Sequence, residues 1–343
     1  MSETKFGLDT FGDVTVNDAG VPTPAHQVIR DVIAQATLAD QVGVDAIGLG
    51  EHHRDDYAIS SPDMVLAAIA GQTSRIHLGT AVTVLSSDDP VRVYERFATL
   101  DAVSNGRAEI TLGRGSFTES FPLFGYDLEQ YETLFNEKLD LFSKLLTEKP
   151  VHWQGTHRAP LHGANVYPKT AAGRLPAWIG VGGSPESVIR SVKYGIPMAL
   201  AIIGGDPARF APYVDLYHRA QDEIGRDRMP LSAHSPGHIA ATDERAREQL
   251  FPHFKANRDR IGAERGWPPT SHDDFLNEAD SGSLYVGSPE TVARRIASTV
   301  QTLGLDRFDL KYANGPMPHD QLAESIELYG QTVIPMVKDM LRR

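Results

Sequence analysis

Short apolar runs alternate with longer segments of helical period along most of the chain. Apolar runs of about four to eight residues between turn signals are typical of buried strands. Apolar residues that recur every three or four positions indicate the buried face of an amphipathic helix. In residues 26–43, Val28, Val32, Ala36 and Ala39 follow this spacing. Strands that alternate with helices predict βα units around a parallel sheet.

This alternation predicts eight strands and a helix after nearly every one of them. The strands are expected at residues 6–11, 46–49, 76–85, 108–112, 177–181, 198–203, within 231–242, and at 308–312. The helices are expected at residues 26–43, 90–103, 128–146, 185–194, 208–224, 244–265, 289–303 and 320–341, with one more that begins at Ser61 and Pro62. Residues 150–175 break the rhythm and indicate a hairpin or an irregular insertion. Residues 266–287, rich in Pro, Asp, Ser and Gly, indicate a mobile loop.

Eight strands, each but the seventh followed simply by one helix, predict an α/β fold, the (β/α)8 TIM barrel. Such a barrel takes about 250 residues, and more with insertions. The extra length of this chain falls near 150–175 and 252–287. Because no shift in composition marks a boundary, we expect one domain over residues 1–343. An open doubly wound sheet is the alternative, since the same alternation also produces it.

The charged residues are mostly acidic, which excludes several classes of function. The 343 residues carry 33 Lys and Arg against 45 Asp and Glu, a net charge of −12. This balance argues against non-specific binding to nucleic acid or to anionic membranes. The absence of cysteine excludes disulfides, cysteine-ligated metals and a thiol nucleophile. With no signal pattern and no apolar stretch of roughly 20 residues, we expect a cytoplasmic protein that binds neither nucleic acid nor membrane.

The polar cluster Glu51, His52 and His53 follows the apolar run at 46–49. In a TIM barrel the active site is built at the C-terminal ends of the strands, and this cluster lies at one. Buried polar groups are costly unless they are hydrogen-bonded or used, and histidine changes charge near neutral pH. Adjacent residues of a strand point to opposite sides, so we expect only one of these two histidines to face the barrel mouth. Catalysis and a structural hydrogen bond are both compatible with such a histidine.

A glycine-rich turn at the end of the fifth strand is suited to a phosphate. Gly182, Gly183, Ser184 and Ser187 lie where a strand gives way to a helix, and free N–H groups with the helix dipole favour an anion there. The chain contains a nearly identical string at 287–291, which a plain serine N-cap with proline at the first helical position explains. A plain cap is therefore the alternative for the first string as well.

Two further patterns are candidates for a ligand site. Arg114, between glycines after the fourth strand, is suited to a phosphate or carboxylate, although a solvated loop arginine has the same pattern. The small residues from Gly79 to Val82 leave room for a flat ring at the barrel mouth, although they also suit packing beneath a helix. His234 and His238 near the seventh strand are additional pocket candidates. No HExxH motif or other metal-ligand spacing occurs, so we expect no metal.

At this point the residues carry a resemblance to a known family. Glu51-His52-His53 is followed in order by GTAVTVL at 79–85, DPVR at 89–92, LD at 100–101, SNGR at 104–107, GRG at 113–115, GGS at 182–184, GIPM at 195–198, ANG at 313–315 and VIPM at 333–336. Together these stretches resemble the bacterial luciferase-like flavin monooxygenases, and in particular the luciferase α subunit. The resemblance extends over nearly the whole chain.

The resemblance implies a two-component, FMN-dependent monooxygenase on a TIM barrel. In this family reduced FMN arrives from a separate FMN reductase, reacts with O2 and oxygenates a small organic substrate. An F420-dependent oxidoreductase on the same fold and a non-catalytic flavin-binding protein are the alternatives. The resemblance also implies a homodimer that pairs through helices beside the second and third strands.

The resemblance assigns roles to individual residues. His52 matches the catalytic histidine of the family, and Glu51 matches its companion carboxylate. Thr80, Ala81 and Val82 lie where the flavin ring binds, and the bond between Ala81 and Val82 matches a cis peptide beneath that ring.

The phosphate positions are assigned in the same way. Arg114 and Ser184 match phosphate-binding residues. Gly183 stands where luciferase has a glutamate close to the phosphate, and Ser187 stands where it has a threonine. Gly182 belongs to the same turn.

Overall fold

The parallel strands of the computed structural model, which describes residues 3–17, 19–115 and 117–342, form a sheet that is nearly closed into a barrel. The strands are β1 Lys5–Thr10, β2 Ala46–Leu49, β3 His77–Thr80, β4 Thr83–Val84, β5 Ile110–Gly113, β8 Ala177–Val181, β9 Met198–Ala201, β10 Leu231–Ile239 and β12 Arg307–Lys311. They pair in the order β3-β2-β1-β12-β10-β9-β8-β5-β4, all in parallel. Leu78 on β3 bonds across to the chain just before β5. Its N–H donates to the carbonyl of Arg107, and its carbonyl accepts from the N–H of Glu109. The predicted (β/α)8 barrel is confirmed.

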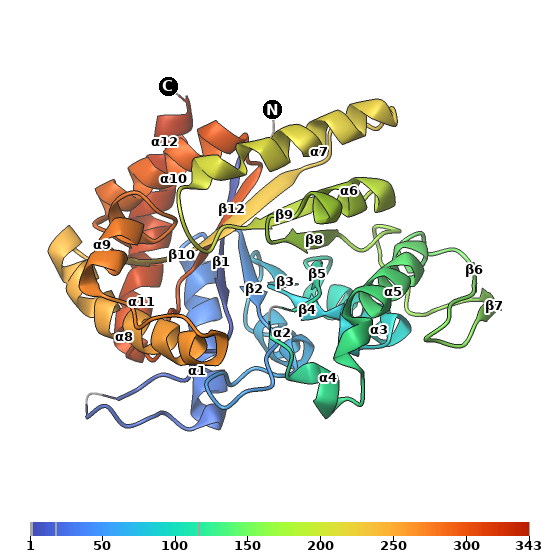
Figure 1. Ribbon diagram of the computed structural model, residues 1–343, viewed down its shortest axis with the longest axis horizontal. Coiled ribbons are helices and arrows are strands. Elements are labelled where there is room, and N and C mark those ends of the chain that lie inside the picture. The colour runs from blue at the N-terminus through green and yellow to red at the C-terminus, as the bar shows by residue number, and fades with distance from the viewer. Residues whose placement is uncertain (1–2, 18, 116, 343) are drawn as a thin grey trace.

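The helices surround these strands (Figure 1). The longer ones are α1 Ala25–Gln41, α2 Pro62–Ala70, α3 Pro90–Ser104, α5 Tyr131–Leu145, α6 Pro185–Tyr194, α7 Ala211–Glu223, α8 Asp243–Arg265, α10 Pro289–Leu303, α11 His319–Leu328 and α12 Ile334–Arg342. A π-turn, Tyr329–Val333, separates α11 from α12, so the expected helix at 320–341 is interrupted. The bounds expected at 185–194 and 289–303 match α6 and α10, because serine caps and proline at the first position mark both starts.

Two insertions depart from the βα rhythm in different ways. The first forms the antiparallel hairpin of β6 (Val151–Trp153) and β7 (Leu161–Ala164), which stands out beyond α5 in Figure 1. The mobile loop predicted at 266–287 is wrong. That segment contains the helix α9 (His272–Asp280) and the strand β11 (Tyr285–Gly287), which pairs with β10. Its polar residues include a capping box between Ser271 and Asp274, so polarity there marks a helix start.

The strand predicted at 76–85 is shorter than expected. β3 ends at Thr80, the bond between Ala81 and Val82 is cis, and pairing resumes in the short strand β4. The cis bond is the one that the resemblance predicts. A short helix, α4 (Ser120–Leu123), follows β5 in the long connection to α5.

A buried guanidinium occupies the barrel interior near the N-terminal ends of the strands. The Arg307 side chain on β12 donates to Glu109 across the barrel, and its Nε donates to Asp309 at 2.7 Å. Burial raises the pKa of the Asp309 carboxyl to about 6, although Arg307 opposes this shift. A Cβ on Gly7 would collide with the Asp309 carboxylate, and one on Gly79 would press on Glu109. TIM barrels usually fill this region with bulky branched residues, and here three charged side chains fill it.

We expect Arg307→Met to lower the free energy of unfolding by about 3 kcal/mol, because two buried carboxylates lose their counter-charge. Urea unfolding at pH 7 measures the change. The matched control is Arg92→Met, where an exposed guanidinium leaves an exposed partner, Glu95, and a loss below about 0.5 kcal/mol is expected. Adding Glu109→Gln and Asp309→Asn to the Arg307 variant should restore most of the loss. Equal stability of the single and triple variants would contradict the ionic explanation.

Candidate functional site

A cavity lies inside the barrel between the middle of the strands and their C-terminal ends. Its volume is about 60 Å³, and its wall includes Thr80, Ala81 and Val82. Small residues make up much of the rest of the wall, namely Gly48, Gly180, Ala199 and Ala201. The structure therefore brings the three predicted ring-binding residues together on one wall. Apolar walls of this kind with a few polar groups are typical of cofactor sites.

The hydroxyl of Thr80 fastens the end of β3 to its neighbour. Thr80 Oγ1 donates to the carbonyl of Thr111 at 3.1 Å and accepts from its N–H at 3.2 Å. Thr83 Oγ1 donates to Thr80 Oγ1 at 3.0 Å. These contacts hold the wall of the cavity in place on both sides of the cis bond.

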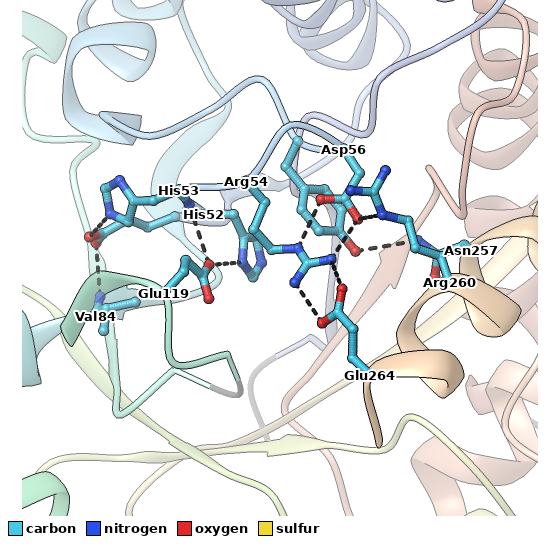
Figure 2. Close-up of polar contacts among 11 residues, drawn as sticks. His52, His53, Arg54, Asp56, Val84, Glu119, Asn257, Arg260 and Glu264 are labelled. Carbon is cyan, nitrogen blue, oxygen red and sulfur yellow. Dashed lines mark hydrogen bonds and ion pairs between the residues drawn. The ribbon is translucent and has the colours of Figure 1, made fainter. Parts of the chain in front are cut away.

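His52 lies in the loop after β2, inside a group of aromatic rings. Its imidazole stacks on Tyr57 with ring centroids 4.5 Å apart and contacts Phe11 and Phe117 at 4.8 and 5.1 Å. The residue is only 8% exposed. Figure 2 shows its Nδ1 turned toward the carboxylate of Glu119, at 3.5 Å. This distance is an ion-pair contact and is too long for a good hydrogen bond.

Glu119 is the carboxylate next to His52, and sequence reasoning missed it. Burial acts to raise the pKa of the Glu119 carboxyl, but the His52 imidazole and the N–H of His53 outweigh burial and hold that pKa below its ordinary value. The carboxylate is therefore anionic near neutral pH and faces Nδ1 of His52. The residue follows β5 in the barrel-mouth loop, a position that only the fold reveals.

The side chains of Glu51 and His53 contact each other, and Glu51 also contacts the backbone of β4. One carboxylate oxygen of Glu51 accepts from the N–H of Val84 at 2.9 Å, and the other lies 3.2 Å from His53 Nε2. The His53 ring also packs edge-on against Phe124 at 5.0 Å. Within the described part of the chain, the carboxylate at ion-pair distance from His52 is that of Glu119. Glu51 instead anchors the strand that follows the cis bond.

Four side chains meet at the N-terminus of α6 in an anion cradle, which we define as Arg114, Ser184, Ser187 and Arg190. Ser184 caps the helix by accepting from the N–H of Ser187 at 3.3 Å, and its hydroxyl donates to Ser187 Oγ at 2.9 Å. Both guanidinium groups reach Ser187 Oγ, at 3.5 Å from Arg114 and 3.3 Å from Arg190. The structure thus unites Arg114 with the predicted serines and adds Arg190, which sequence reasoning missed. Arg190 follows Ser187 by three positions, a spacing that places both on one helix face.

The similar string at 287–291 has one such cation, Arg294, whose guanidinium donates to Thr291 Oγ1 at 3.4 Å. Ser288 caps α10 there, but the Asp243 carboxylate accepts from the Ser288 N–H at 2.6 Å and from the Thr291 hydroxyl at 3.0 Å. A carboxylate thus occupies the place that an anion would take. Of two nearly identical strings, only the one at 182–187 has an arginine pair at its helix start.

A buried pair of titratable groups also lines the cavity. Asp9 Oδ2 lies 3.0 Å from His234 Nδ1. Burial acts to lower the pKa of the His234 imidazole, and the positive charge of Lys311 acts in the same direction. The carboxylates of Asp9 and Asp309 outweigh both effects and raise that pKa above its ordinary value. Asp9 is 2% exposed, and its Oδ1 has no hydrogen-bond partner among residues 3–17, 19–115 and 117–342. An orphaned buried oxygen in a cavity is available to a ligand donor.

His238 is different. It bonds to Gln249 through Nε2 at 2.8 Å, and burial lowers the pKa of its imidazole to about 4. It is not among the residues that line the cavity, and its hydrogen bond joins β10 to α8.

The C-terminal half of α8 is fastened to the loop that carries His52. Arg54 donates to Glu264 at 2.8 and 2.6 Å and to Asp56 at 2.9 Å, and Arg260 pairs with Asp56 at 3.2 Å. Asn257 donates to the Tyr57 hydroxyl at 3.3 Å, and Figure 2 shows these contacts side by side. The insertion expected near 252–287 therefore begins with the end of helix α8, which ion pairs hold to this loop.

The model of the luciferase-like monooxygenase family matches residues 10–307. This chain belongs to that family. It is an enzyme of the luciferase-like type, and the resemblance stated from its sequence is confirmed.

Relatives of this luciferase-like enzyme span nearly its whole length. The 4-hydroxyprotoasukamycin monooxygenase of Streptomyces nodosus subsp. asukaensis is 29% identical over 91% of this chain and 87% of its own. An alkanal monooxygenase alpha chain of Photorhabdus luminescens is 27% identical over 91% of this chain and 92% of its own.

Solved structures share the barrel at lower sequence identity. The monooxygenase RslO1 of Streptomyces bottropensis has a TM-score of 0.83 at 22% identity, covering 96% of this chain and 99% of its own. The oxygenating constituent of 3,6-diketocamphane monooxygenase from Pseudomonas putida, in complex with FMN, has a TM-score of 0.78 at 18% identity and covers 97% and 98%. An F420-dependent tetrahydromethanopterin reductase of Methanopyrus kandleri has a TM-score of 0.71 at 20% identity and covers 97% and 99%.

In residues 3–17, 19–115 and 117–342, no group of three or more His, Asp or Glu side chains is placed to hold a metal ion. Among the described helices, none has the length and apolar character to cross a membrane.

We expect Asp9→Asn to lower the pKa of the His234 imidazole, because the substitution removes the facing charge and keeps the shape. NMR titration of the histidine C–H signals measures the change, with His234→Gln to assign the signal. The folded-state pKa is raised in the native protein, so the pair's contribution to stability is full below the ordinary histidine pKa and is lost as pH rises through the raised value. His238 is the internal control and should keep its low pKa. An unchanged His234 titration in the variant would contradict the pairing.

Proposed function

We propose that this enzyme is a two-component FMN-dependent monooxygenase. It would take reduced FMN from a separate FMN reductase and use O2 to oxygenate a small organic substrate. The observation that carries the proposal is the anion cradle at the start of α6, in the same barrel as a cavity walled by Thr80, Ala81 and Val82. A phosphate site in the same barrel as a cavity walled by small residues supports a ligand that carries both a phosphate and a flat ring, as FMN does.

The residues present fit the FMN phosphate. Two guanidinium groups and two hydroxyls complement a phosphate dianion, and the N-terminus of α6 adds its dipole. Gly183 has a φ of +99°, and a Cβ on Gly182 would meet no atom within 4 Å, so the backbone of this turn leaves room for an anion. Arg114, Ser184, Ser187 and Arg190 would hold the phosphate there.

The lining of the cavity supports ring binding through its small residues and one unpartnered acceptor. Ala81, Val82 and Gly180 would contact the ring, and the free Oδ1 of Asp9 would accept a hydrogen bond from an N–H of the ligand. Reduced FMN supplies the electrons that activate O2 when it is bound. The protein supplies position and exclusion of water.

His52 would hold and move a proton at the mouth of the barrel. Anionic Glu119 favours a proton on the facing Nδ1, which leaves Nε2 to exchange a proton with a reacting group. The rings of Phe11, Tyr57 and Phe117 exclude water from this imidazole. Glu51 would act as a positioning residue, because both of its oxygens are engaged by Val84 and His53.

The wider context is part of the same proposal. The enzyme would act in the cytoplasm as a single domain over residues 1–343, with neither nucleic acid nor membrane as a partner. It would be a homodimer, since α1 and α2 present an apolar groove that includes Ile29, Ile33 and Met64, the last 69% exposed. Exposed apolar surface of this kind is typical of protein interfaces.

We expect the protein to bind FMN more tightly than F420, measured by quenching of flavin fluorescence and by calorimetry. Supplied with an FMN reductase, NADH and candidate substrates, it should incorporate one atom of ¹⁸O2 into product. An F420-dependent neighbour shares the fold, so preferred binding of F420 would replace this proposal with the F420-dependent alternative. Tight FMN binding without O2-dependent turnover of any substrate would favour the non-catalytic alternative.

We expect His52→Ala to lower turnover by about 100-fold, which is the usual contribution of a positioned general acid or base. The dissociation constant of FMN should change by less than about twofold, because the imidazole contacts neither the anion cradle nor the cavity wall. His162→Ala in the exposed hairpin serves as the control and should leave both quantities unchanged. Turnover that survives in the His52 variant would remove this residue from the mechanism.

A further inference from the structure

The anion cradle already holds a negative charge from the protein itself. Glu132, in the first turn of α5, places one carboxylate oxygen on Arg114 and the other 3.2 Å from Arg190 Nη2. The two arginines share Ser187 on their other side. The Glu132 carboxylate thus bridges the two guanidinium groups of the cradle.

The two arginines are more firmly held than the carboxylate between them. The Arg114 guanidinium lies over the ring of Tyr131 at 5.5 Å, and that of Arg190 lies over Phe135 at 5.4 Å. The Arg190 side chain is 12% exposed, whereas that of Glu132 is 50% exposed. The cations are therefore fixed in place by aromatic packing, and the anion has solvent into which it can swing.

We propose that Glu132 is a built-in competitor for the phosphate of the ligand. Its carboxylate occupies the cation pair in the free protein and is displaced when a phosphate monoester binds. The inference rests on the proposed function in that FMN is the phosphate monoester considered. It goes beyond that function by naming the residue that sets how tightly the phosphate is held.

The charges give the direction of the effect. A carboxylate and a phosphate dianion on the same two arginines repel each other, so each excludes the other from the full set of contacts. Displacing Glu132 loses two charge-assisted contacts before the phosphate gains its own. Affinity for the phosphate is thereby lowered, while affinity for the flavin ring is untouched. This suits a flavin that must arrive from a reductase and leave after each turnover.

The test compares the dissociation constants of FMN and riboflavin, which lacks the phosphate, in the native protein and in Glu132→Gln. The amide keeps the size of the side chain and removes its charge. We expect FMN to bind about three- to tenfold more tightly to the variant, as expected for the loss of a half-exposed ion pair. Riboflavin should bind with an unchanged constant. Glu129→Gln, an exposed change of the same net charge just before α5, is the matched control and should leave both constants unchanged.

FMN affinity that is unchanged or weaker in Glu132→Gln would overturn the inference, because the carboxylate would then be neutral or helpful to binding. Equal tightening for riboflavin would overturn it as well.

A second measurement separates this inference from the proposed function. Inorganic phosphate should raise the midpoint of thermal unfolding more in Glu132→Gln than in the native protein, at ionic strength matched with chloride. If neither protein binds FMN but this difference is found, the competitor role stands and the proposed function fails. If FMN binds and neither measurement distinguishes the variant, the competitor role fails and the proposed function stands.

Discussion

The site depends on the buried charge cluster of Arg307, Glu109 and Asp309 near the N-terminal ends of the barrel strands. Because these side chains fill the space between opposite strands, the positions facing them at Gly7 and Gly79 have no room for a Cβ. Replacing such a cluster by apolar residues often costs nothing in stability. In this protein the cluster determines the shape of the barrel interior. Arg307 and Asp309 bound the cavity on the side of the N-terminal strand ends, and small residues toward the C-terminal ends leave it open.

The alternation of apolar runs predicted the barrel well, because each strand and helix has a local signal. Caps at Ser184 and Ser288 fixed two helix starts to the residue. The errors have physical causes. The helix at 272–280 is short and polar, with only Phe275 and Ala279 buried, so its period was too weak to outweigh its composition. The break in β3 comes from a cis bond, which apolar spacing does not encode.

The candidate site was less accessible to sequence reasoning than the fold, because its pairs join distant parts of the chain. Glu119 contacts His53 across 66 positions, and Asp9 contacts His234 across 225. Neither partner has a local pattern that identifies it. The expected ring and phosphate positions come from the family resemblance, because the motifs that carry it recur along the chain in order. Arg190 is the one missed residue with a local signal, three positions after Ser187.

The net charge of −12 makes local cations necessary for binding a phosphate. An acidic protein repels a phosphate-bearing ligand at long range, and salt screens this repulsion beyond about 10 Å. Attraction must therefore come from nearby cations. Arg114 and Arg190 provide it, and burial, followed by the neighbouring Arg114 guanidinium, lowers the pKa of the Arg190 guanidinium. The Glu132 carboxylate pairs with both of these cations in the free protein. The same local field that attracts a phosphate thus explains why the protein places an anion of its own beside the arginines.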